Sequence, residues 1–270
     1  MILVNGHQQD TISALDRGLL YGDGVFETIA VRKGRMTLWD RHMQRLVRGC
    51  ERLAIPIPDI TKLKSEADWL AGHAPLQVIK IIITRGEGGR GYNIPDQQHP
   101  TRILSTHAWP VYPEQMHEKG IRAKICEHRL GVNPALAGIK HLNRLEQVLA
   151  RHEIKGTDYF EGLLRDTDSN IIEGTLSNVF MVKQGNLYTP DLSGCGVEGV
   201  MRSLVLELAS NEGIKCNINS FTVDELLSAD EVFLTNSLAG IVPVTGLEQQ
   251  SYPAGAITKT IQKLIHNKTI

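Results

Sequence analysis

The sequence predicts an α+β fold of two domains, and three features of the chain support this. Strand-like apolar runs and amphipathic helix-like runs share the first 108 residues, as in a mixed domain with its own core. A segment with two prolines follows, which is typical of a linker. Beyond it, hairpin-like strand pairs dominate. We expect a smaller N-terminal α/β domain over residues 1–108, a linker over about 109–118 and a larger C-terminal domain over 119–270.

The N-terminal domain is predicted to contain a hairpin, two helices and further strands. Lys33-Gly34 lies between runs of strand-forming residues and predicts the turn of an antiparallel hairpin within residues 21–40. Apolar residues spaced by three and four predict helices over residues 41–55 and 61–73. The other expected strands cover residues 1–6, 76–86 and 101–111, of which the last two are expected to pair.

The C-terminal domain is predicted to be rich in hairpins, with helices among and after them. Runs of apolar and β-branched residues predict the strands, and apolar residues at helical spacing predict the helices. The expected strands and hairpins cover residues 121–128, 160–174, 177–190, 230–237 and 241–248. The expected helices cover residues 199–213, 221–229 and 254–268.

Composition and charge exclude several classes of protein. The formal net charge is −1, so no charge imbalance favours nucleic acid or an anionic membrane. The longest apolar runs are too short to span a bilayer, and the first ten residues do not resemble a secretion signal, so we expect a cytoplasmic protein. The cysteines are widely separated and the histidines lack metal spacing, so we expect free thiols and no metal site. The cysteines are Cys50, Cys126, Cys195 and Cys216.

A single lysine, Lys140, lies just inside the start of a predicted helix over residues 136–153. The apolar residues of this stretch recur at intervals of three and four, so that one stripe would face a core. They are Ile139, Leu142, Leu145, Val148 and Leu149. The ordinary interpretation of such a lysine is a solvated surface residue. Only candidate groups elsewhere in the chain change that interpretation.

Two glycine-rich segments are candidates for binding anions. Residues 84–93, TRGEGGRGYN, combine glycines with two arginines, and guanidinium groups bind carboxylates well. A phosphate-binding P-loop would end in Gly-Lys-Ser/Thr, which this segment lacks, and a flexible surface loop is an equal alternative. Residues 195–203 lead into a helix, whose first N–H groups, on Val200 and Met201, are suited to phosphate. Residues 235–238, TNSL, follow an apolar strand and would add polar groups.

These candidates together match the needs of pyridoxal phosphate. This cofactor requires a lysine for a Schiff base, an acid for its pyridine nitrogen and a site for its phosphate. Lys140 supplies the first. Glu173, after the predicted hairpin 160–174, is a candidate for the second, although a solvated turn residue is the more frequent case. The helix start and the strand end supply the third.

Several motifs in order resemble the fold-type IV pyridoxal-phosphate enzymes. They are DRGLLYGDGVFET at residue 16, RHMQRL at 41, Lys140, EGTLSNVF at 173, GVEGVMR at 196 and DEVFLTNS at 230. The resemblance implies a C-terminal domain with a β-barrel-like core and a homodimer. It implies that Lys140 forms the Schiff base, that Glu173 pairs with the pyridine nitrogen and that Arg45 binds the phosphate. Further phosphate contacts are implied for Val200, Met201, Asn236 and Ser237.

Within that family, the segments RGEGGRGY at residue 85 and RLGVNPALAGIKHLNRLEQVLAR at residue 129 are similar to the aminodeoxychorismate lyases. The resemblance implies conversion of 4-amino-4-deoxychorismate to 4-aminobenzoate and pyruvate, a step of folate biosynthesis. It implies an external aldimine, removal of the Cα proton by a buried Lys140 and elimination of enolpyruvate, with Thr28 in proton handling. Arg85, Arg90 and Tyr92 are candidates for reading the substrate carboxylates.

Two alternatives stay open at this point. The first is a D-amino-acid or branched-chain aminotransferase that uses the same lysine and cofactor, since a shared fold does not fix the reaction. Phe26 weakens it, because D-amino-acid aminotransferases resemble this segment but place a tyrosine hydroxyl there. The second is a non-catalytic binding protein that keeps the fold. The presence of Lys140, Glu173 and Arg45 argues against it.

Overall fold

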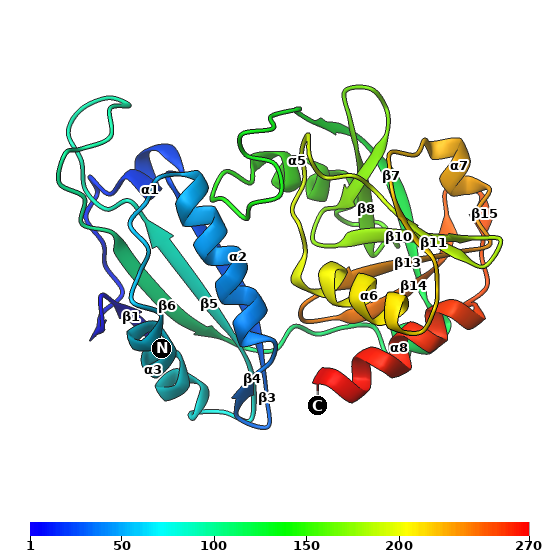
Figure 1. The fold of residues 1–270 in the computed structure, drawn as a ribbon, viewed down its shortest axis with the longest axis horizontal. Coiled ribbons are helices and arrows are strands. Elements are labelled where there is room, and N and C mark those ends of the chain that lie inside the picture. Colours follow the sequence, from blue (N-terminus) through cyan, green and yellow to red (C-terminus); the bar gives the residue numbers. More distant parts are fainter. Residues whose placement is uncertain (270) are drawn as a thin grey trace. The chain divides into compact units, whose positions relative to one another are not determined.

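The computed structural model describes residues 1–269, and the chain divides into two compact units (Figure 1). Unit 1 comprises Met1–Pro110 together with Ile139–Asn143. Unit 2 comprises Val111–Gly138 and the chain from Arg144 onward. The first division falls inside the segment predicted as a linker, whereas the return of residues 139–143 to unit 1 has no counterpart in the sequence analysis.

Unit 1 is built on a six-stranded sheet with the strand order β2-β1-β6-β5-β3-β4. Its strands are β1 Ile2–Val4, β2 His7–Gln8, β3 Gly24–Arg32, β4 Arg35–Met36, β5 Leu76–Thr84 and β6 Thr101–His107. All of its strand pairs are antiparallel. The predicted hairpin turn is confirmed, since Lys33 and Gly34 both have positive φ, 52° and 73°, between the paired residues Arg32 and Arg35.

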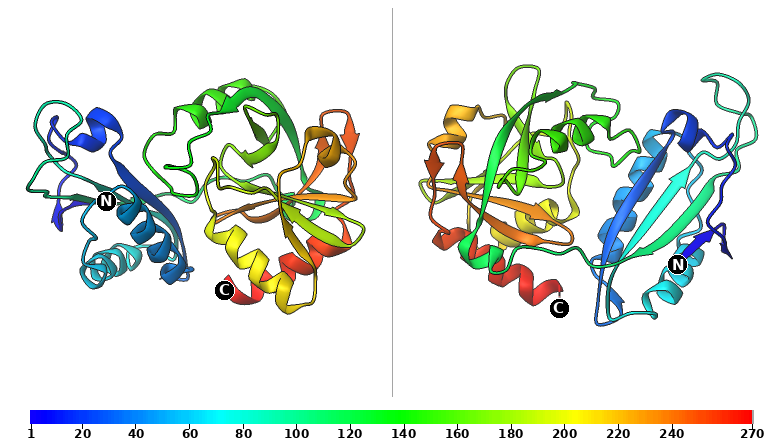
Figure 2. Two further views of the ribbon diagram at one scale, coloured as in Figure 1. Left: turned by 45° about the horizontal axis from the view of Figure 1, so that its top comes forward. Right: turned by 180° about the vertical axis from the view of Figure 1, so that it is seen from behind.

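Two helices cover one face of this sheet. They are α2, Trp39–Arg52, and α3, Ile60–Ala71. Figure 2 shows β3, β5 and β6 side by side, and one apolar cluster joins their residues with α2 and α3. Because side chains alternate along a strand, Val25 and Ile29 of β3 point into this cluster, while Phe26 and Thr28 lie on the opposite face. A short helix that the sequence did not predict, α1 Arg17–Tyr21, precedes β3.

Unit 2 contains a closed barrel of six strands, which confirms the barrel-like core. The ring runs β10-β13-β14-β7-β8-β9 and closes because β9 also pairs with β10. Its strands are β7 Ile121–Leu130, β8 Glu161–Asp166, β9 Ile171–Gly174, β10 Asn178–Lys183, β13 Glu231–Asn236 and β14 Gly240–Leu247. Three short strands extend the sheet: β11 Asn186–Thr189, β12 Cys216–Ile218 and β15 Gln250–Ser251. Closure removes most exposed strand edges from this core.

In the described part of unit 2, five helices accompany the barrel. They are α4 Met116–Lys119, α5 Leu145–Glu153, α6 Val200–Asn211, α7 Val223–Leu227 and α8 Ala256–Thr269. Helices α6 and α8 pack on each other and against β13 and β14, and α5 packs against β7 and β8 (Figure 1). Within residues 1–269, no helix combines the length and the apolar character needed to cross a membrane. The four cysteines are free thiols, as expected.

The helix predicted over residues 136–153 is wrong for its first nine residues. Helix α5 begins only at Leu145, and Gly138 has φ +80°, which a right-handed helix does not allow. The predicted apolar stripe does not face the core either, because Leu145, Val148 and Leu149 are 54–75% exposed. The buried side of α5 instead carries Gln147 and Ala150.

The packing between the barrel wall and α5 predicts a steric effect at Gly162 of β8. A Cβ there would overlap Sγ of the buried Cys126. Gly162→Ala should therefore destabilise the protein by about 1 to 3 kcal/mol, measured by urea unfolding, because overpacking forces side chains out of position. Gly194→Ala is the matched control, since its Cβ would meet only Val132 Cγ1 at an ordinary 3.5 Å. Adding Cys126→Ala to Gly162→Ala should restore part of the loss, and equal stability of the two single variants would contradict the prediction.

Candidate active site

The segment around Lys140 adds to the edge of β3 in unit 1. The Phe26 N–H donates to Lys140 O at 2.9 Å, and the Leu142 N–H donates to Gly24 O at the same distance. His141 forms an isolated antiparallel bridge with Val25. Lys140 is thus held by main-chain hydrogen bonds in an extended conformation, and its side chain is half-buried.

The Lys140 side chain lies on the helix-free face of the sheet. Its Nζ is 4.4 Å from the centroid of the Phe26 ring, and Nζ of Lys80 is 5.3 Å from the same centroid. Thr28, half-buried, is directly opposite Lys80 in the register of β3 and β5. The structure therefore brings two lysines to one aromatic ring, with Thr28 on the same face of the sheet and opposite one of them.

The sequence analysis did not identify Lys80 as a candidate site residue. A signal was present, because Lys80 is the single charged residue inside the apolar run of β5. A charged side chain in such a run needs a polar surrounding, since burying an unpaired charge is costly.

Arg45 belongs to a buried ionic cluster on the α2 side of β3. Its Nε and Nη2 donate to Oε1 and Oε2 of Glu27 at 2.8 and 2.6 Å, and His42 Nδ1 lies 2.6 Å from Oε2. Burial alone would raise the pKa of Glu27, but Arg45 and His42 lower it to about 2. Burial lowers the pKa of His42, although Glu27 opposes this, so the imidazole is neutral and its Nδ1–H donates to Glu27.

Glu173 in β9 of unit 2 is a buried hydrogen-bonded carboxylate and not a solvated turn residue. It is 4% exposed. Its Oε2 accepts from the Val197 N–H at 2.8 Å, and its Oε1 accepts from Gln147 Nε2 at 3.2 Å. Both oxygens of this carboxylate therefore accept a hydrogen bond from the protein. The same loop is tied to residues near Lys140 in sequence, because Gly138 and Val197 form a parallel bridge.

Asn178, which the sequence analysis did not single out, joins three predicted parts of the site within unit 2. In the strand registers it is opposite Glu173 on one side and Thr235 on the other. Its Nδ2 donates to Val197 O at 2.8 Å. A Cβ on Gly199, the N-cap of α6, would overlap its Oδ1. The carboxylate, the helix start and the strand end therefore converge on Asn178.

The start of α6 and the end of β13 have properties suited to an anion. Within residues 1–269, no side chain caps the first turn of α6, where Val200 and Met201 lie. The buried Thr235 Oγ1 has no hydrogen-bond partner in the same described part of the chain. Asn236 and Ser237 follow it and are both partly exposed. The Asn236 side chain also shapes the turn, accepting from the Leu238 N–H at 2.8 Å.

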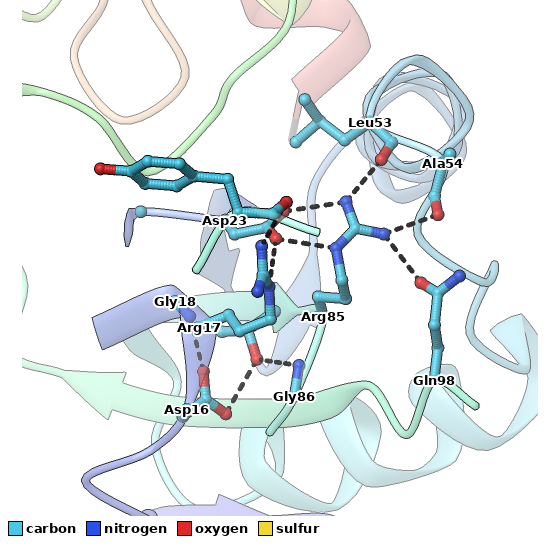
Figure 3. Close-up of polar contacts among 12 residues, drawn as sticks. Asp16, Arg17, Gly18, Asp23, Leu53, Ala54, Arg85, Gly86 and Gln98 are labelled. Carbon is cyan, nitrogen blue, oxygen red and sulfur yellow. Dashed lines mark hydrogen bonds and ion pairs between the residues drawn. The ribbon is translucent and has the colours of Figure 1, made fainter. Parts of the chain in front are cut away.

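Arg85 has a structural role, so we do not retain it as a ligand for substrate. Its guanidinium donates five hydrogen bonds, two to Asp23 and three to the acceptors drawn in Figure 3: Leu53 O, Ala54 O and Gln98 Oε1. Five donors are all that a guanidinium has. Arg90 and Tyr92, by contrast, are exposed, and Tyr92 makes an edge contact with Tyr21 at 5.3 Å between centroids.

Comparison with known proteins identifies a family and two groups of relatives. The model of the amino-transferase class IV family matches residues 24–247. An aminodeoxychorismate lyase of Vibrio harveyi is 40% identical, covering 97% of this chain and 98% of that protein. A D-alanine aminotransferase of Bacillus licheniformis is 30% identical, covering 100% and 97%.

Among solved structures, too, a lyase is more similar to this chain than an aminotransferase is. The crystal structure of 4-amino-4-deoxychorismate lyase from Pseudomonas aeruginosa is 45% identical with a TM-score of 0.95, covering 99% of this chain and 98% of that one. The Escherichia coli branched-chain amino acid aminotransferase is 26% identical with a TM-score of 0.86, covering 98% and 93%. The match to the family model, over most of the chain, and these relatives show that the chain belongs to the class IV aminotransferase family.

Proposed function

We propose that this protein is a pyridoxal-phosphate-dependent lyase that converts 4-amino-4-deoxychorismate to 4-aminobenzoate and pyruvate, a step of folate biosynthesis. The observation that carries the proposal is the placement of the Lys140 amine over Phe26, on the same face as Thr28 and Lys80. The lyases of Vibrio harveyi and Pseudomonas aeruginosa support it, since they are more similar to this chain than the aminotransferases named above.

The residues present fit pyridoxal phosphate. Lys140 would bind it covalently through its amine, and the buried Glu173 carboxylate would accept the pyridine N–H. The phosphate would bind the N–H groups of Val200 and Met201, the strand end at Asn236 and Ser237, and Arg45. The uncapped α6 turn and the unpartnered Thr235 Oγ1, both within the described residues, favour an anion there. When bound, the cofactor supplies an electron sink for the carbon that loses a proton.

The protein's own chemistry is then the movement of protons. Lys140 Nζ is the base that takes the proton from the substrate carbon, and as an acid it can then give a proton to the departing enolpyruvate, which becomes pyruvate, because that carbon carries no hydrogen in the aromatic product. Main-chain hydrogen bonds fix the Lys140 backbone, so only the side chain has to move. We infer that the Thr28 hydroxyl, which is opposite Lys80 on the neighbouring strand, relays a proton on the same face. Phe26 has no hydroxyl and serves as the apolar wall beneath the amine.

The substrate carries two carboxylates, which require cationic or hydrogen-bonding partners. We propose Lys80, Arg90 and Tyr92 for this role. Lys80 is the strongest of the three, because it shares its aromatic ring with Lys140. Arg90 and Tyr92 are exposed in the loop after β5.

We also propose that the protein acts in the cytoplasm and as a homodimer. The exposed apolar side chains of Leu145, Val148 and Leu149 on α5 favour a protein contact.

The first test is product formation without any added 2-oxoacid. The purified protein, loaded with pyridoxal phosphate, is incubated with 4-amino-4-deoxychorismate, and both products are measured. Equal release of 4-aminobenzoate and pyruvate is expected. If neither forms, while D-alanine and 2-oxoglutarate yield pyruvate, the chain is an aminotransferase and Thr28 loses its assigned role.

Replacing the lysine should separate covalent attachment from binding. Lys140→Ala should lose the visible absorbance of the lysine-bound cofactor, and kcat should fall by about 10³-fold, within the usual range for removing a general base. The measurements are the absorbance spectrum and the protein mass after borohydride reduction. Lys80→Ala is the matched control, expected to keep the covalent link and to raise KM. Retained covalent cofactor in Lys140→Ala would remove Lys140 from its role.

The Glu27 cluster predicts a pH dependence of stability. The pKa of Glu27 is held at about 2, below its ordinary 4.5, so its ionised form stabilises the fold above about pH 4.5. This contribution disappears as pH falls from about 4.5 to 2. Glu27→Gln should cost about 3 kcal/mol at pH 7, because Arg45 loses its buried partner, and the difference should narrow in acid.

Urea unfolding of wild type and Glu27→Gln between pH 7 and 3 measures this difference. Asp68→Asn is the control, since Asp68 pairs with Lys64 at an exposed site and should matter by less than about 1 kcal/mol. A difference between wild type and Glu27→Gln that does not change with pH would show that the charge of Glu27 is not responsible.

A further inference from the structure

Two arginines share one carboxylate at the base of the loop that follows β5. Arg17 Nε donates to Asp23 Oδ2 at 2.9 Å, and Arg85 Nε donates to the same oxygen at 2.7 Å (Figure 3). Both arginines are 3% exposed. Burial alone would raise the pKa of Asp23, but the two guanidinium groups lower it, so the carboxylate is ionised.

The two arginines differ in what their other donors bind. The other donors of Arg85 bind carbonyl oxygens at the end of α2 and the side chain of Gln98. Arg85 therefore connects α2, the end of β5 and the end of the loop. The other donors of Arg17 reach the tip of the loop instead. Its Nη1 donates to Gly91 O at 3.0 Å, and its Nη2 donates to Tyr92 O at 3.4 Å.

The loop packs along the whole of Arg17. The Arg17 N–H donates to Gly86 O at 2.9 Å, where the loop begins. A Cβ on Gly88 would lie 2.8 Å from Arg17 Cδ, so the loop backbone lies directly on the side-chain stem. The Arg17 guanidinium carbon is 5.0 Å from the centroid of the Tyr21 ring, which Tyr92 contacts.

A loop with this composition needs such a support. Residues 86–91 contain four glycines, which have more backbone freedom than any other residue. The Tyr92 side chain is 85% exposed, so burial does little to order it. The planar fork of a guanidinium binds a carboxylate and two carbonyl oxygens in fixed directions, which a lysine ammonium cannot reproduce.

We propose that Arg17 is a positioning residue: it holds the loop of residues 86–98 in the conformation that presents Arg90 and Tyr92 to the substrate. Only the presentation of Arg90 and Tyr92 to the substrate rests on the proposed function. The statement that Arg17 holds the loop follows from the contacts of Arg17 alone.

Trypsin tests whether Arg17 holds the loop, because it cleaves after the exposed Arg90. Arg17→Met should release the fragment 1–90 at least tenfold faster than wild type, in holoenzyme of unchanged circular dichroism. Arg102→Met is the matched control, since Arg102 also pairs with a carboxylate of unit 1, that of Glu66, and its replacement is expected to leave this rate within twofold. If Arg17→Met does not fold, Arg17→Lys replaces it. An unchanged rate in the folded variant overturns the proposal.

Kinetics test whether the loop is held for the substrate. Arg17→Met should raise KM for 4-amino-4-deoxychorismate about tenfold, while the cofactor absorbance persists and kcat falls by less than threefold. In an Arg90→Ala, Tyr92→Ala background, Arg17→Met should raise KM no further, because the presented side chains are gone. An additive tenfold rise there would overturn the proposal. If wild type forms no 4-aminobenzoate, the proposed function fails, and the trypsin rates still decide whether Arg17 holds the loop.

Discussion

The main-chain hydrogen bonds between β3 and residues 140–142 are the interaction on which the lysine site depends. Strand β3 is nine residues long, but β4 pairs only with its last two residues. The opposite end of the same edge, at Gly24 and Phe26, bonds instead to Leu142 and Lys140. A sheet edge with unpaired N–H and C=O groups is a ready partner for an extended segment. The edge of one strand thus fixes where the lysine backbone lies.

The other parts of the site depend on Asn178 in a comparable way. Its amide and its neighbours in the strand registers link Glu173, the loop before α6 and the end of β13. Gly199 has room for no side chain beside it. Because α6 begins there without a side-chain cap from the described residues, its first N–H groups stay directed at whatever anion binds. The barrel thereby positions polar groups that lie far apart in the sequence.

Local patterns predicted the elements well and failed where distant residues decide the conformation. The Lys33-Gly34 turn, the alternation along β3 and β5 and the main helices follow from periodicity and turn residues. The helix predicted from residue 136 failed, because Gly138 adopts positive φ and the chain beyond it bonds to β3. Lys140 and its partner Phe26 are 114 residues apart, and local periodicity cannot predict a pairing over that separation.

The same limit applies to single side chains of the candidate site. Lys140 and Glu173 were candidates from the sequence, and the family resemblance implied their roles. In the structure the Lys140 amine lies over the Phe26 ring, and Glu173 accepts a hydrogen bond from the Val197 N–H. Arg85 and Arg90 are equivalent in the sequence, yet one has every donor occupied by the protein and the other is exposed. Lys80 and Asn178 become visible only when strand registers bring them beside other residues.

The contacts of Arg17 have a consequence for how this enzyme scaffold can change. Arg17 bonds to the carbonyl oxygens of Gly91 and Tyr92 and to no loop side chain through those donors. A carbonyl group is the same whatever residue carries it. The loop can therefore exchange side chains at its exposed positions while keeping its attachment, which allows mutation to alter substrate preference separately from folding. A library randomised at Arg90 and Tyr92, with Arg17 retained, is a natural starting point for engineering new substrates.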